Sequence, residues 1–380
     1  WSEKGGLPRR LLEARLPPAT GFHPATVRAG LADAWDHFRG AALWECIDRE
    51  LTALPGRRFS GYRDTAVVLA GALPMPTWLA MLSPLLFRGR VRAKPARHDP
   101  VSAPAFREAL IGTSPRHAQW VSVCELPDHE EGAWDAFLDA ECVVAFGSDA
   151  TVAELARRMP EGRRFVEHGH RASFAVVGPE LRGDALGAIA RALARDIALW
   201  DQLGCLSPVA VYVDRRVIDP FADALCEAFP KIEEELPRGE CGLGARDAIA
   251  DAVADAEFRA AAGGSVRVET GEYAAWVVVR EADCNARTHP LHRFVRLYPA
   301  TDLGGVVRSL APWRGRLAGL GLAGFGAETS DAAAALAGVA PSRICRVGRM
   351  QAPPLAWSHD NRGLLDPLGG WTDLELASLE

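Results

Sequence analysis

The chain has 380 residues, 48% of them hydrophobic and 24% charged, with a net charge of −6. This length exceeds one ordinary core and predicts two or three domains, and the acidic balance argues against broad nucleic-acid binding. The eight cysteines lack metal-finger spacing, which favours reduced thiols in a cytoplasmic protein, and the longest apolar run, 78–87, is too short to span a membrane.

The first 60 residues predict helices, at 26–37 and 42–54, broken by Pro17-Pro18 and Pro55-Gly56. After residue 60, strands alternate with helices of similar size, a pattern typical of a parallel sheet covered on both faces. The expected strands are 65–70, 90–94, 120–125, 142–146 and 173–177, and the expected helices are 77–86, 106–111, 134–139 and 150–159.

A second α/β unit is expected from residue 178. Its predicted elements are helices at 184–199, at 219–229 (ended by Pro230) and at 303–310, with strands at 209–213, 273–279, 294–298 and, as the last strand, 317–322. The tail is rich in proline, glycine and aromatic residues, so we expect it to fold back onto the body. A subunit interface is one location that would suit it. The predicted domains are a helical lead-in (1–60), a dinucleotide-binding domain (61–177), a catalytic domain (178–342) and the tail (343–380).

Cys205 stands at a junction between two predicted elements. A helix ends at residue 199, a tight turn follows, and a β-branched strand begins after Pro208. A thiol that two rigid elements hold, with its sulfur still reachable, suits a nucleophile that forms a covalent thioester. The alternative is a small buried apolar residue, the commoner state of a cysteine.

A strand, a Gly-Ser turn and a helix follow one another around Gly147 and Ser148. The backbone N–H groups and the positive dipole end at such a turn can bind a phosphate. The alternative is that Ser148 or Asp149 serves only as a helix N-cap, and this reading is favoured when the turn is taken alone.

Lys94 and Arg97 leave the end of the predicted strand 90–94. In this fold class a lysine at a strand end can reach ribose hydroxyls, and a neighbouring arginine suits a 2′-phosphate. The alternative is an ordinary solvated basic cluster.

Glu167, His168 and His170 precede an apolar strand and are candidate general acids or bases. They could equally form a hydrogen-bonded turn. The two histidines are two residues apart and would share a strand face, but the sequence offers no further ligands, so no metal site is predicted.

Together these segments resemble the aldehyde dehydrogenase superfamily and, within it, the fatty-acid reductases of the LuxC type, which convert long-chain acyl thioesters to aldehydes. The resemblance covers nearly the whole chain, from a helical lead-in that ends at Glu50-Leu51. Its most specific parts are the Cys205 segment and the tail. The tail motifs are 346–350, 353–354, 357–360 and 371–375.

The resemblance implies an aldehyde-dehydrogenase-like α/β fold with a Rossmann-type cofactor domain and an α/β catalytic domain. It implies that Cys205 accepts the acyl group and that Lys94 contacts the adenosine ribose. Phe146, Gly147 and Ser148 would lie near the pyrophosphate. Arg97 stands where NAD-preferring relatives often carry glutamate, so NADPH is favoured over NADH.

Glu167 matches the glutamate that activates water in hydrolytic aldehyde dehydrogenases. A reductase has no use for activated water, so Glu167 either helps to deprotonate Cys205 or is structural. The sequence departs from the superfamily at Ala72-Leu73-Pro74, where an asparagine commonly binds the developing oxyanion. Loss of one oxyanion donor typically lowers the rate by about 10²–10³-fold.

We therefore expect an NADPH-dependent reductase of fatty acyl thioesters, carried on CoA or on an acyl carrier, that works through an acyl-enzyme on Cys205. One alternative is a catalytically degenerate relative that binds acyl chains or partner proteins. Another is an NADP-dependent aldehyde dehydrogenase. The family analogy also implies a homodimer or larger oligomer and a partner enzyme that transfers acyl groups.

Overall fold

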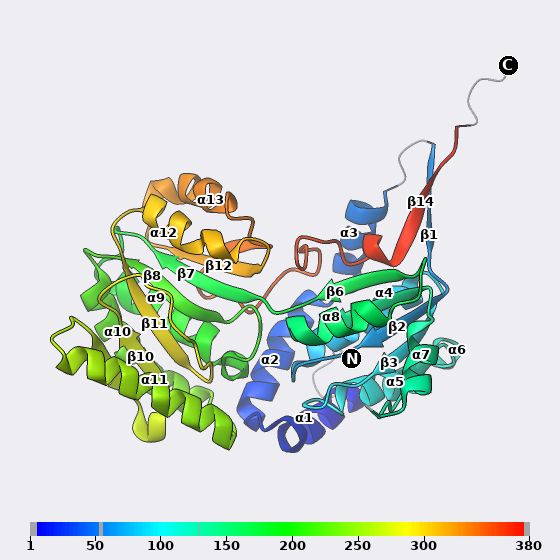
Figure 1. The fold of residues 1–380 in the computed structure, drawn as a ribbon, viewed down its shortest axis with the longest axis horizontal. Coiled ribbons are helices and arrows are strands. Elements are labelled where there is room, and N and C mark those ends of the chain that lie inside the picture. Colours follow the sequence, from blue (N-terminus) through cyan, green and yellow to red (C-terminus); the bar gives the residue numbers. More distant parts are fainter. Residues whose placement is uncertain (1–5, 53–55, 128, 376–380) are drawn as a thin grey trace. The chain divides into compact units, whose positions relative to one another are not determined.

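The computed structural model describes residues 6–52, 56–127 and 129–375. The chain forms two compact units, one made of 1–20, 33–170 and 354–380, the other of 21–32 and 171–353. Each unit contains its own parallel or largely parallel β-sheet, as the alternation of strands and helices predicted (Figure 1).

The sheet of the first unit has five parallel strands in the order β4-β3-β2-β5-β6. Its strands are β2 (Asp64–Val68), β3 (Arg90–Lys94), β4 (Val121–Val123), β5 (Cys142–Phe146) and β6 (Arg164–His168). The chain order reverses between β2 and β5. Ligands of such sheets bind outside the carboxyl ends of the strands at this reversal.

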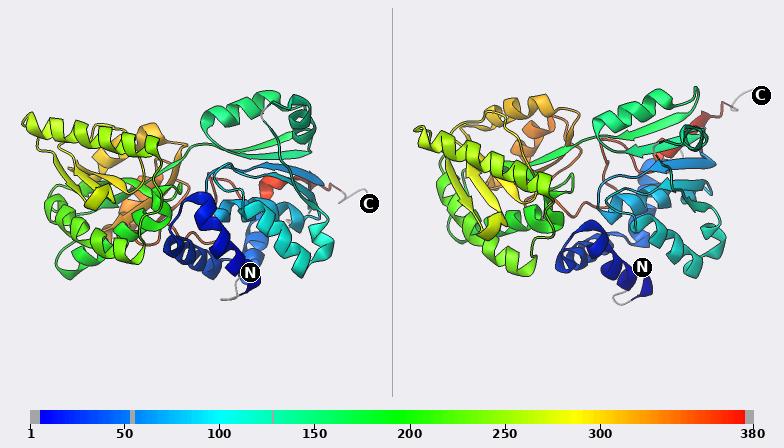
Figure 2. Two further views of the ribbon diagram at one scale, coloured as in Figure 1. Left: turned by 90° about the horizontal axis from the view of Figure 1, so that it is seen from below. Right: turned by 60° about the horizontal axis from the view of Figure 1, so that its bottom comes forward.

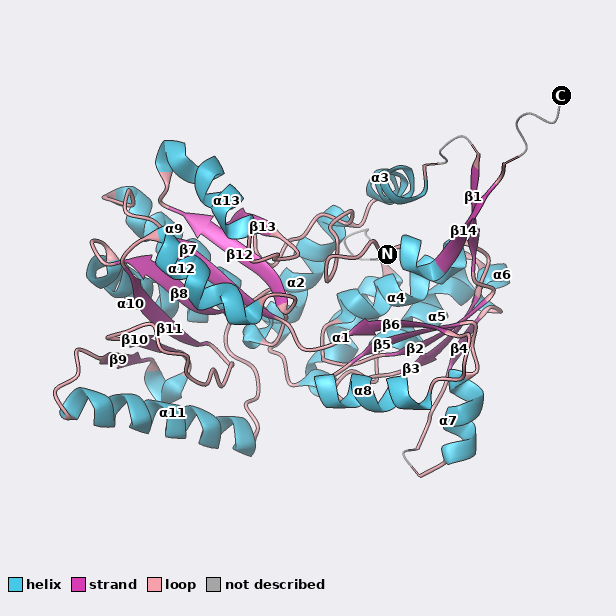
Figure 3. Ribbon diagram, turned by 45° about the horizontal axis from the view of Figure 1, so that its top comes forward, coloured by secondary structure: helices cyan, strands magenta, loops and turns pink. Residues whose placement is uncertain are grey.

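Helices cover both faces of this sheet. α4 (Pro74–Leu86) and α5 (Ser102–Thr113), followed by the short α6 (Pro115–Ala118), lie on one face, and α7 (Glu131–Leu138) and α8 (Asp149–Arg158) lie on the other (Figure 3). The buried side chains of α7 and α8 form one hydrophobic cluster with β2 and β5. Right-handed crossovers between parallel strands place successive helices in this way.

The chain ends of the first unit contribute helices and a separate two-stranded sheet. The N-terminal helices are α1 (Leu7–Thr20), α2 (Pro24–His37), which continues from the second unit, and α3 (Gly40–Leu51). β1 (Arg57–Gly61) and β14 (Gly369–Asp373) pair antiparallel over their whole length, so a segment from the end of the chain lies beside one from its beginning (Figure 1). The prediction that the tail folds back onto the body is confirmed.

The sheet of the second unit has seven strands in the order β13-β12-β7-β8-β11-β10-β9. All neighbouring strands are parallel except the edge pair β9–β10. The strands are β7 (Ala172–Val177), β8 (Pro208–Asp214), β9 (Arg267–Thr270), β10 (Val277–Arg280), β11 (Phe294–Ala300), β12 (Leu317–Ala323) and β13 (Ile344–Arg346).

The helices of the second unit are α9 (Asp184–Ala198), α10 (Ile218–Glu235), α11 (Leu243–Ala261), α12 (Leu303–Leu310) and α13 (Thr329–Ala337). α12 and α13 bury side chains against β7, β8, β11 and β12 in one cluster, while α11 runs alongside β9 and β10 (Figure 2). Short 3₁₀ helices occupy Leu199–Gln202, Glu272–Ala274, Ala311–Trp313, Gly326–Glu328 and Asp366–Leu368.

The predicted helices broken by proline need correction. α1 continues through Pro17 and Pro18 to Thr20, and α10 continues through Pro230 to Glu235. A proline inside a helix removes one backbone hydrogen bond, and in α10 the buried Phe229 and Ile232 on either side stabilise the helix by packing. The predicted helix 42–54 corresponds to α3, which ends at Leu51. The end of that prediction and part of the break predicted after it fall on residues 53–55, which lie outside the described residues.

Several strands and helices were not predicted. β1 falls where a helical lead-in was expected, and β6 replaces the expected turn around Glu167. β10 is shorter than the predicted strand 273–279. The predicted last strand, 317–322, is followed by two more, β13 and β14, and α11, β9 and α13 carry no prediction. The strand 173–177 was assigned to the first α/β unit, but β7 lies in the seven-stranded sheet of the second unit.

Candidate functional site

The candidate cofactor residues lie at the carboxyl ends of the strands of the five-stranded sheet. Strand register places Val68, the last residue of β2, beside Lys94 of β3 and Ala145 of β5. Phe146 is in turn paired with His168 at the end of β6. The carboxyl ends of these four strands therefore meet at the reversal of strand order, where this fold class binds nucleotides.

The Gly147–Ser148 turn is shaped by hydrogen bonds of its own. The Ser148 hydroxyl accepts a bond from the Thr151 amide at 3.1 Å and so is the N-cap of α8. The capping bond does not decide whether the turn also binds a phosphate, which stays a prediction. The Gly147 amide donates to the His168 carbonyl at 3.1 Å. A Cβ on Gly147 would lie 3.2 Å from the Thr151 Cβ, so glycine lets the turn pack close to the helix. The amides after Gly147, at the start of α8, are the ones that could face a phosphate.

The two basic candidates differ in their surroundings. Lys94 is half-buried, and its Nζ lies 5.7 Å from the centroid of the Trp134 ring, a cation–π contact. Arg97 is exposed on the loop that follows β3. Buried Asp99 shapes that loop by accepting bonds from the amides of Val101 and Ser102, at 3.1 and 2.9 Å. Burial raises the pKa of the Asp99 carboxyl, and these hydrogen bonds oppose the rise.

Glu167 lies at the exposed end of the edge strand β6, and its side chain is 50% exposed. Its Oε1 is 3.7 Å from Nη2 of Arg362, a tail residue that the sequence did not single out. Ion pairs at such exposure contribute about 0–1 kcal/mol. Glu167 therefore stays available for other contacts, and its role remains a prediction.

His168 is joined by two residues of the tail motif. Its Nδ1 lies 2.7 Å from Oδ2 of Asp360, and its ring stacks on Phe146 and His359, with centroids 4.5 and 4.7 Å away. His170, the partner that the sequence considered, is exposed and donates its amide to Asp149 instead. Only the specificity of the tail motif hinted at the contribution of His359 and Asp360.

The side chains of His168, His359 and Asp360 also bring three possible metal-ligand atoms within 4.8 Å of one another. The two imidazole rings are nearly parallel, at 18°. Imidazole lone pairs lie in the ring plane, so stacked rings do not converge on one ion. The geometry favours a hydrogen-bonded Asp–His pair inside an aromatic stack over a metal centre.

The loop after β2 has no side-chain oxyanion donor. Ala72 is buried at 8% exposure, Leu73 precedes the helix, and α4 begins with Pro74. Pro74 and Pro76 have no N–H, so the first turn of α4 also offers fewer backbone donors than an ordinary helix start. The departure seen in the sequence is thus not compensated by the start of this helix.

The Cys205 turn is anchored on both sides of the cysteine in the second unit. Ser173 Oγ on β7 donates to the Cys205 carbonyl at 2.7 Å, and the Ser207 amide donates to Gly204 O at 2.9 Å. Leu206 and Ser207 are buried while Cys205 itself is exposed. The backbone is therefore fixed and the side chain reachable, the combination expected of a nucleophile.

All eight cysteines lie in the described part of the chain and are free thiols. Cys205 is exposed, whereas the other seven are buried or half-buried. Burial raises the pKa of Cys46 and Cys226 to about 11 and that of Cys142 to about 12, and it raises the pKa of Cys345 to about 11. Because the thiolate is the reactive form, burial disfavours reaction at these four thiols, whereas Cys205 is exposed and can be reached from solvent.

The residues before Cys205 adopt an unusual backbone. Trp200, Asp201 and Gln202 have φ values of 58°, 49° and 63°, each costing about 1–2 kcal/mol for a residue with a Cβ. Trp200 is packed edge-on against Phe22, with centroids 5.2 Å apart, and a Cβ at Gly30 would lie 2.0 Å from its ring. Tight packing thus stabilises the strained turn.

A buried network supports the far side of the turn. Gln351 contacts the Ser207 hydroxyl and donates to the Asp196 carbonyl at 3.0 Å. The Asp196 carboxyl accepts from the Gly348 amide at 2.6 Å, and burial raises its pKa to about 6. The sequence gave no sign of these contacts, because Gln351 is more than 140 residues from its partners.

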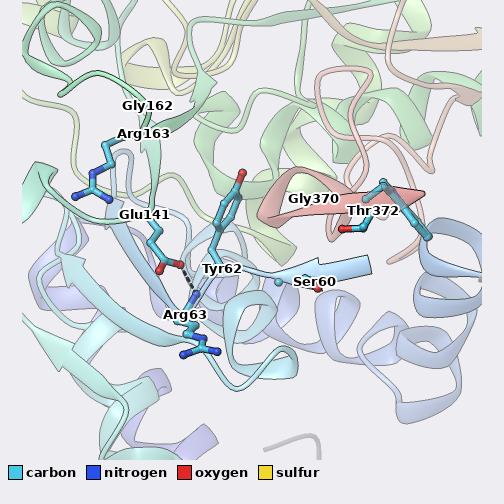
Figure 4. Close-up of a pocket in the computed structure, with 10 residues that line it drawn as sticks. Ser60, Tyr62, Arg63, Glu141, Gly162, Arg163, Gly370 and Thr372 are labelled. Carbon is cyan, nitrogen blue, oxygen red and sulfur yellow. Dashed lines mark hydrogen bonds between the residues drawn. The ribbon is translucent and has the colours of Figure 1, made fainter. Parts of the chain in front are cut away.

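A hollow of about 450 Å³ lies elsewhere in the first unit (Figure 4). It is formed by the β1–β14 ribbon and by residues that precede β2, β5 and β6, namely Arg63, Glu141 and Arg163, with Glu141 accepting a bond from the Arg63 amide at 2.7 Å. These are the amino ends of the strands. The hollow therefore lies at the amino ends of the strands, opposite to the end that carries the candidate cofactor residues, and none of those residues lines it.

Solved structures define the class of fold. An oxidoreductase from Marinobacter aquaeolei has a TM-score of 0.75 and 14% identity, over 96% of this chain and 81% of that one. Aldehyde dehydrogenase 21 from Physcomitrella patens, in complex with the reaction product succinate, has a TM-score of 0.73 and 15% identity, over 95% and 81%. A cysteine-to-alanine variant of indole-3-acetaldehyde dehydrogenase from P. syringae, in complex with NAD+ and IAA, has a TM-score of 0.71 and 15% identity, over 97% and 82%. The fold is that of the aldehyde dehydrogenases.

The family is narrower than the fold. Residues 57–368 match LuxC, the acyl-CoA reductase family, and the chain belongs to this family. It is 23% identical over 262 residues to long-chain acyl-protein thioester reductase 2 of Photobacterium leiognathi. The aligned region covers 65% of this chain and 53% of that protein. The chain thus spans about half the length of this curated relative. Within the described residues, no helix is long and apolar enough to cross a membrane.

Proposed function

We propose that the protein reduces fatty acyl thioesters to aldehydes with NADPH, through an acyl-enzyme on Cys205. The observation that carries the proposal is an exposed thiol on an anchored turn in a chain of the acyl-CoA reductase family. The relative from Photobacterium leiognathi is named for the same reaction on long-chain acyl-protein thioesters. The substrate would be a long acyl chain on CoA or on an acyl carrier.

The chemistry begins with the Cys205 thiolate, which attacks the thioester carbonyl carbon. The carbon–sulfur bond to the carrier breaks, the carrier leaves as a thiol after taking up a proton, and the acyl group remains on Cys205 as a new thioester. A reduced nicotinamide, when bound, would supply the hydride for conversion of this acyl group to an aldehyde, and the Cys205 thiolate would be the leaving group. One NADPH and one proton are consumed for each aldehyde and carrier thiol released.

Residues of the chain have distinct tasks in this scheme. The amides at the start of α8 would bind the pyrophosphate, with Phe146 and Gly147 setting the turn, and Lys94 would contact the adenosine ribose. Arg97 would pair with the 2′-phosphate, since a guanidinium matches phosphate geometry. The backbone amide of Cys205 would stabilise the oxyanion in place of the missing asparagine. Glu167 would have no water to activate in this scheme, and its two roles inferred from the sequence, help in deprotonating Cys205 or a structural role, stay predictions.

A second candidate is a relative that accepts acyl groups without reducing them. The observation that favours it is the loop 72–74, where a buried alanine and a proline at the helix start leave fewer oxyanion donors. Such a protein would be acylated at Cys205 by acyl-CoA and would consume no NADPH. An NADP-dependent aldehyde dehydrogenase would instead release free acid from aldehyde and NADP without CoA.

The test is to mix the purified chain with palmitoyl-CoA and NADPH, and to follow NADPH absorbance, aldehyde and free CoA. We expect the three to change in equal amounts and Cys205→Ala to lower the rate by at least about 10³-fold, because the nucleophile is lost. The matched control is Cys226→Ala, which removes a half-buried thiol of the same unit and should keep the rate. Unchanged NADPH with wild type, or full activity in Cys205→Ala, contradicts the proposal.

The cytoplasmic location, the oligomeric state and the acyl-transferring partner enzyme stay predictions from the sequence. Size-exclusion chromatography with light scattering would measure the mass of the assembly directly.

A further inference from the structure

A buried ion pair ties the Cys205 turn to a second turn of the same unit. Arg293 donates to Asp201 Oδ1 from Nε at 2.9 Å and from Nη2 at 2.6 Å. The side chains of Arg293 and Asp201 are only 1% and 4% exposed. A charge pair this deeply buried is expensive to desolvate, so its presence four residues before Cys205 calls for a specific reason.

The two turns share an unusual backbone. Asp201 is the middle of three consecutive non-glycine residues with positive φ, and Arg293 ends another such run, in which Leu291, His292 and Arg293 have φ values of 65°, 54° and 69°. Strained backbones of this kind persist only where surrounding contacts impose them, and they cluster at functional sites. The ion pair joins one strained turn to the other.

Both turns lead into neighbouring strands from the same end. β8 and β11 are adjacent and parallel, with Ala210 paired to Arg296. The segments before Pro208 and Phe294 therefore lie side by side at the amino ends of these two strands. Gln202 Nε2 donates to both Pro208 O and Phe294 O, each at 2.9 Å. This amide therefore fixes the two strand starts to each other and to the turn that carries Cys205.

The ion pair is itself held from α10 and the segment after it. Arg293 Nη1 lies 2.6 Å from Glu233 Oε2 and donates to Leu236 O at 2.8 Å. Asp201 Oδ2 accepts from the Gly239 amide at 3.1 Å. Every one of these groups belongs to the second unit, so the proposal requires no contact with the first unit.

We propose that Asp201 and Arg293 are positioning residues, which hold the strained turn in the conformation that presents the Cys205 sulfur for acylation. The proposal rests on the proposed function of Cys205, but the geometry that it invokes is independent of the cofactor. Loss of the pair would let the turn relax to an ordinary backbone and would move the sulfur away from its reactive position. The effect falls on the rate of acyl transfer rather than on binding of the acyl-CoA.

The test measures two rates at Cys205 in Asp201→Asn, by intact-protein mass spectrometry with peptide mapping. One is acylation by palmitoyl-CoA without NADPH, and the other is alkylation by iodoacetamide across pH 6–9. We expect acylation at saturating palmitoyl-CoA to fall by about 10- to 100-fold with less than a threefold change in half-saturating concentration, a split that general destabilisation does not produce. The pH profile of alkylation should shift as well, because the surroundings of the sulfur change.

The matched control is Glu281→Gln, which breaks the other deeply buried pair of this unit, Glu281 with Arg296. Glu281 follows β10, and its amide donates to the Leu297 carbonyl at 2.9 Å, so it lies level with the middle of β11 and not with the segment before that strand. Its loss should lower the unfolding temperature without changing either rate by more than about twofold. If Asp201→Asn does not fold, Arg293→Lys keeps the charge but loses the two-pronged contact, and the same rates are measured on it.

The outcomes separate the two proposals. Wild type that is alkylated but never acylated at Cys205 overturns the proposed function, and the alkylation rates then still test the ion pair. Wild type that is acylated, together with a folded Asp201→Asn or Arg293→Lys of wild-type rates, overturns the positioning role alone. Equal loss in Glu281→Gln also overturns it, because stability would then explain the effect.

Discussion

Asp196 is a buried residue whose backbone carbonyl is linked to the Cys205 turn through Gln351 and Ser207, and whose carboxyl accepts from the Gly348 amide at 2.6 Å. Burial raises its pKa from 3.8 to about 6, so in the folded state it keeps its proton to a higher pH than in the unfolded chain. Between about pH 4 and 6 the unfolded state loses the proton first, and stability falls as the pH rises.

We therefore expect Asp196→Asn, which cannot ionise, to gain stability over wild type as the pH rises. The difference should be small at pH 4 and reach up to about 3 kcal/mol at pH 7, since each pKa unit corresponds to about 1.36 kcal/mol. Urea unfolding of both proteins at pH 4, 5, 6 and 7 measures it. The control is Asp251→Asn, an exposed position on α11, and a difference that does not vary with pH would refute the expectation.

At the scale of elements, the tail depends on one carboxylate of α3. Glu50 accepts hydrogen bonds from three successive amides, those of Leu364 at 2.9 Å, Leu365 at 2.6 Å and Asp366 at 3.1 Å. A Cβ on Gly363 would lie 2.3 Å from Glu50 Oε2, so the chain passes close against the carboxylate. Hydrogen bonds to a charged acceptor are among the stronger ones.

Glu50→Gln should loosen the tail at this anchor, because an amide has one acceptor oxygen where the carboxylate has two. We expect the amides of 364–366 to exchange with deuterium about 5- to 100-fold faster, corresponding to about 1–3 kcal/mol of local stability. Exchange followed by mass spectrometry measures this. Glu45→Gln, at an exposed position of the same helix, should leave the exchange unchanged, and equal protection in both variants would argue against the anchor.

The sequence predicts elements well where local pattern and burial agree. The strand 142–146 is found as predicted because every residue of β5 but the last is buried, which produces an unbroken apolar run. β6 was missed because only Val166 of its five residues is buried, so an edge strand reads as a polar turn. The sequence predicts a helix end at Pro230, because the local effect of a proline is visible in the sequence and the tertiary packing that outweighs it is not.

At the scale of the whole molecule, the same division holds for the site. The turns that contain Cys205 and Gly147–Ser148 could be located because each lies at a junction of regular elements, where the sequence pattern changes. Asp360 could not be paired with His168, nor Arg293 with Asp201, since they are separated by 192 and 92 residues. Contacts at such separation depend on strand order, which periodicity does not contain.

The proposed preference for NADPH over NADH is one that a single residue should control. A ligand that binds the folded protein raises its unfolding temperature, by about 2.7 kcal/mol of stability at one hundred times its dissociation constant. For a unit of this size that corresponds to roughly 5–10 °C. At equal millimolar concentrations we expect a larger shift with NADPH than with NADH, because Arg97 would pair with the additional phosphate.

Arg97→Ala should remove most of that difference while leaving the NADH shift in place, and scanning calorimetry with each nucleotide measures it. The control is Arg164→Ala, an exposed arginine at the amino end of β6 and hence at the opposite edge of the same sheet. It removes the same charge from the molecule, so it separates a local phosphate contact from the effect of net charge. Equal shifts with NADPH and NADH in wild type would mean that Arg97 does not recognise the 2′-phosphate, and the proposed preference for NADPH would then be wrong.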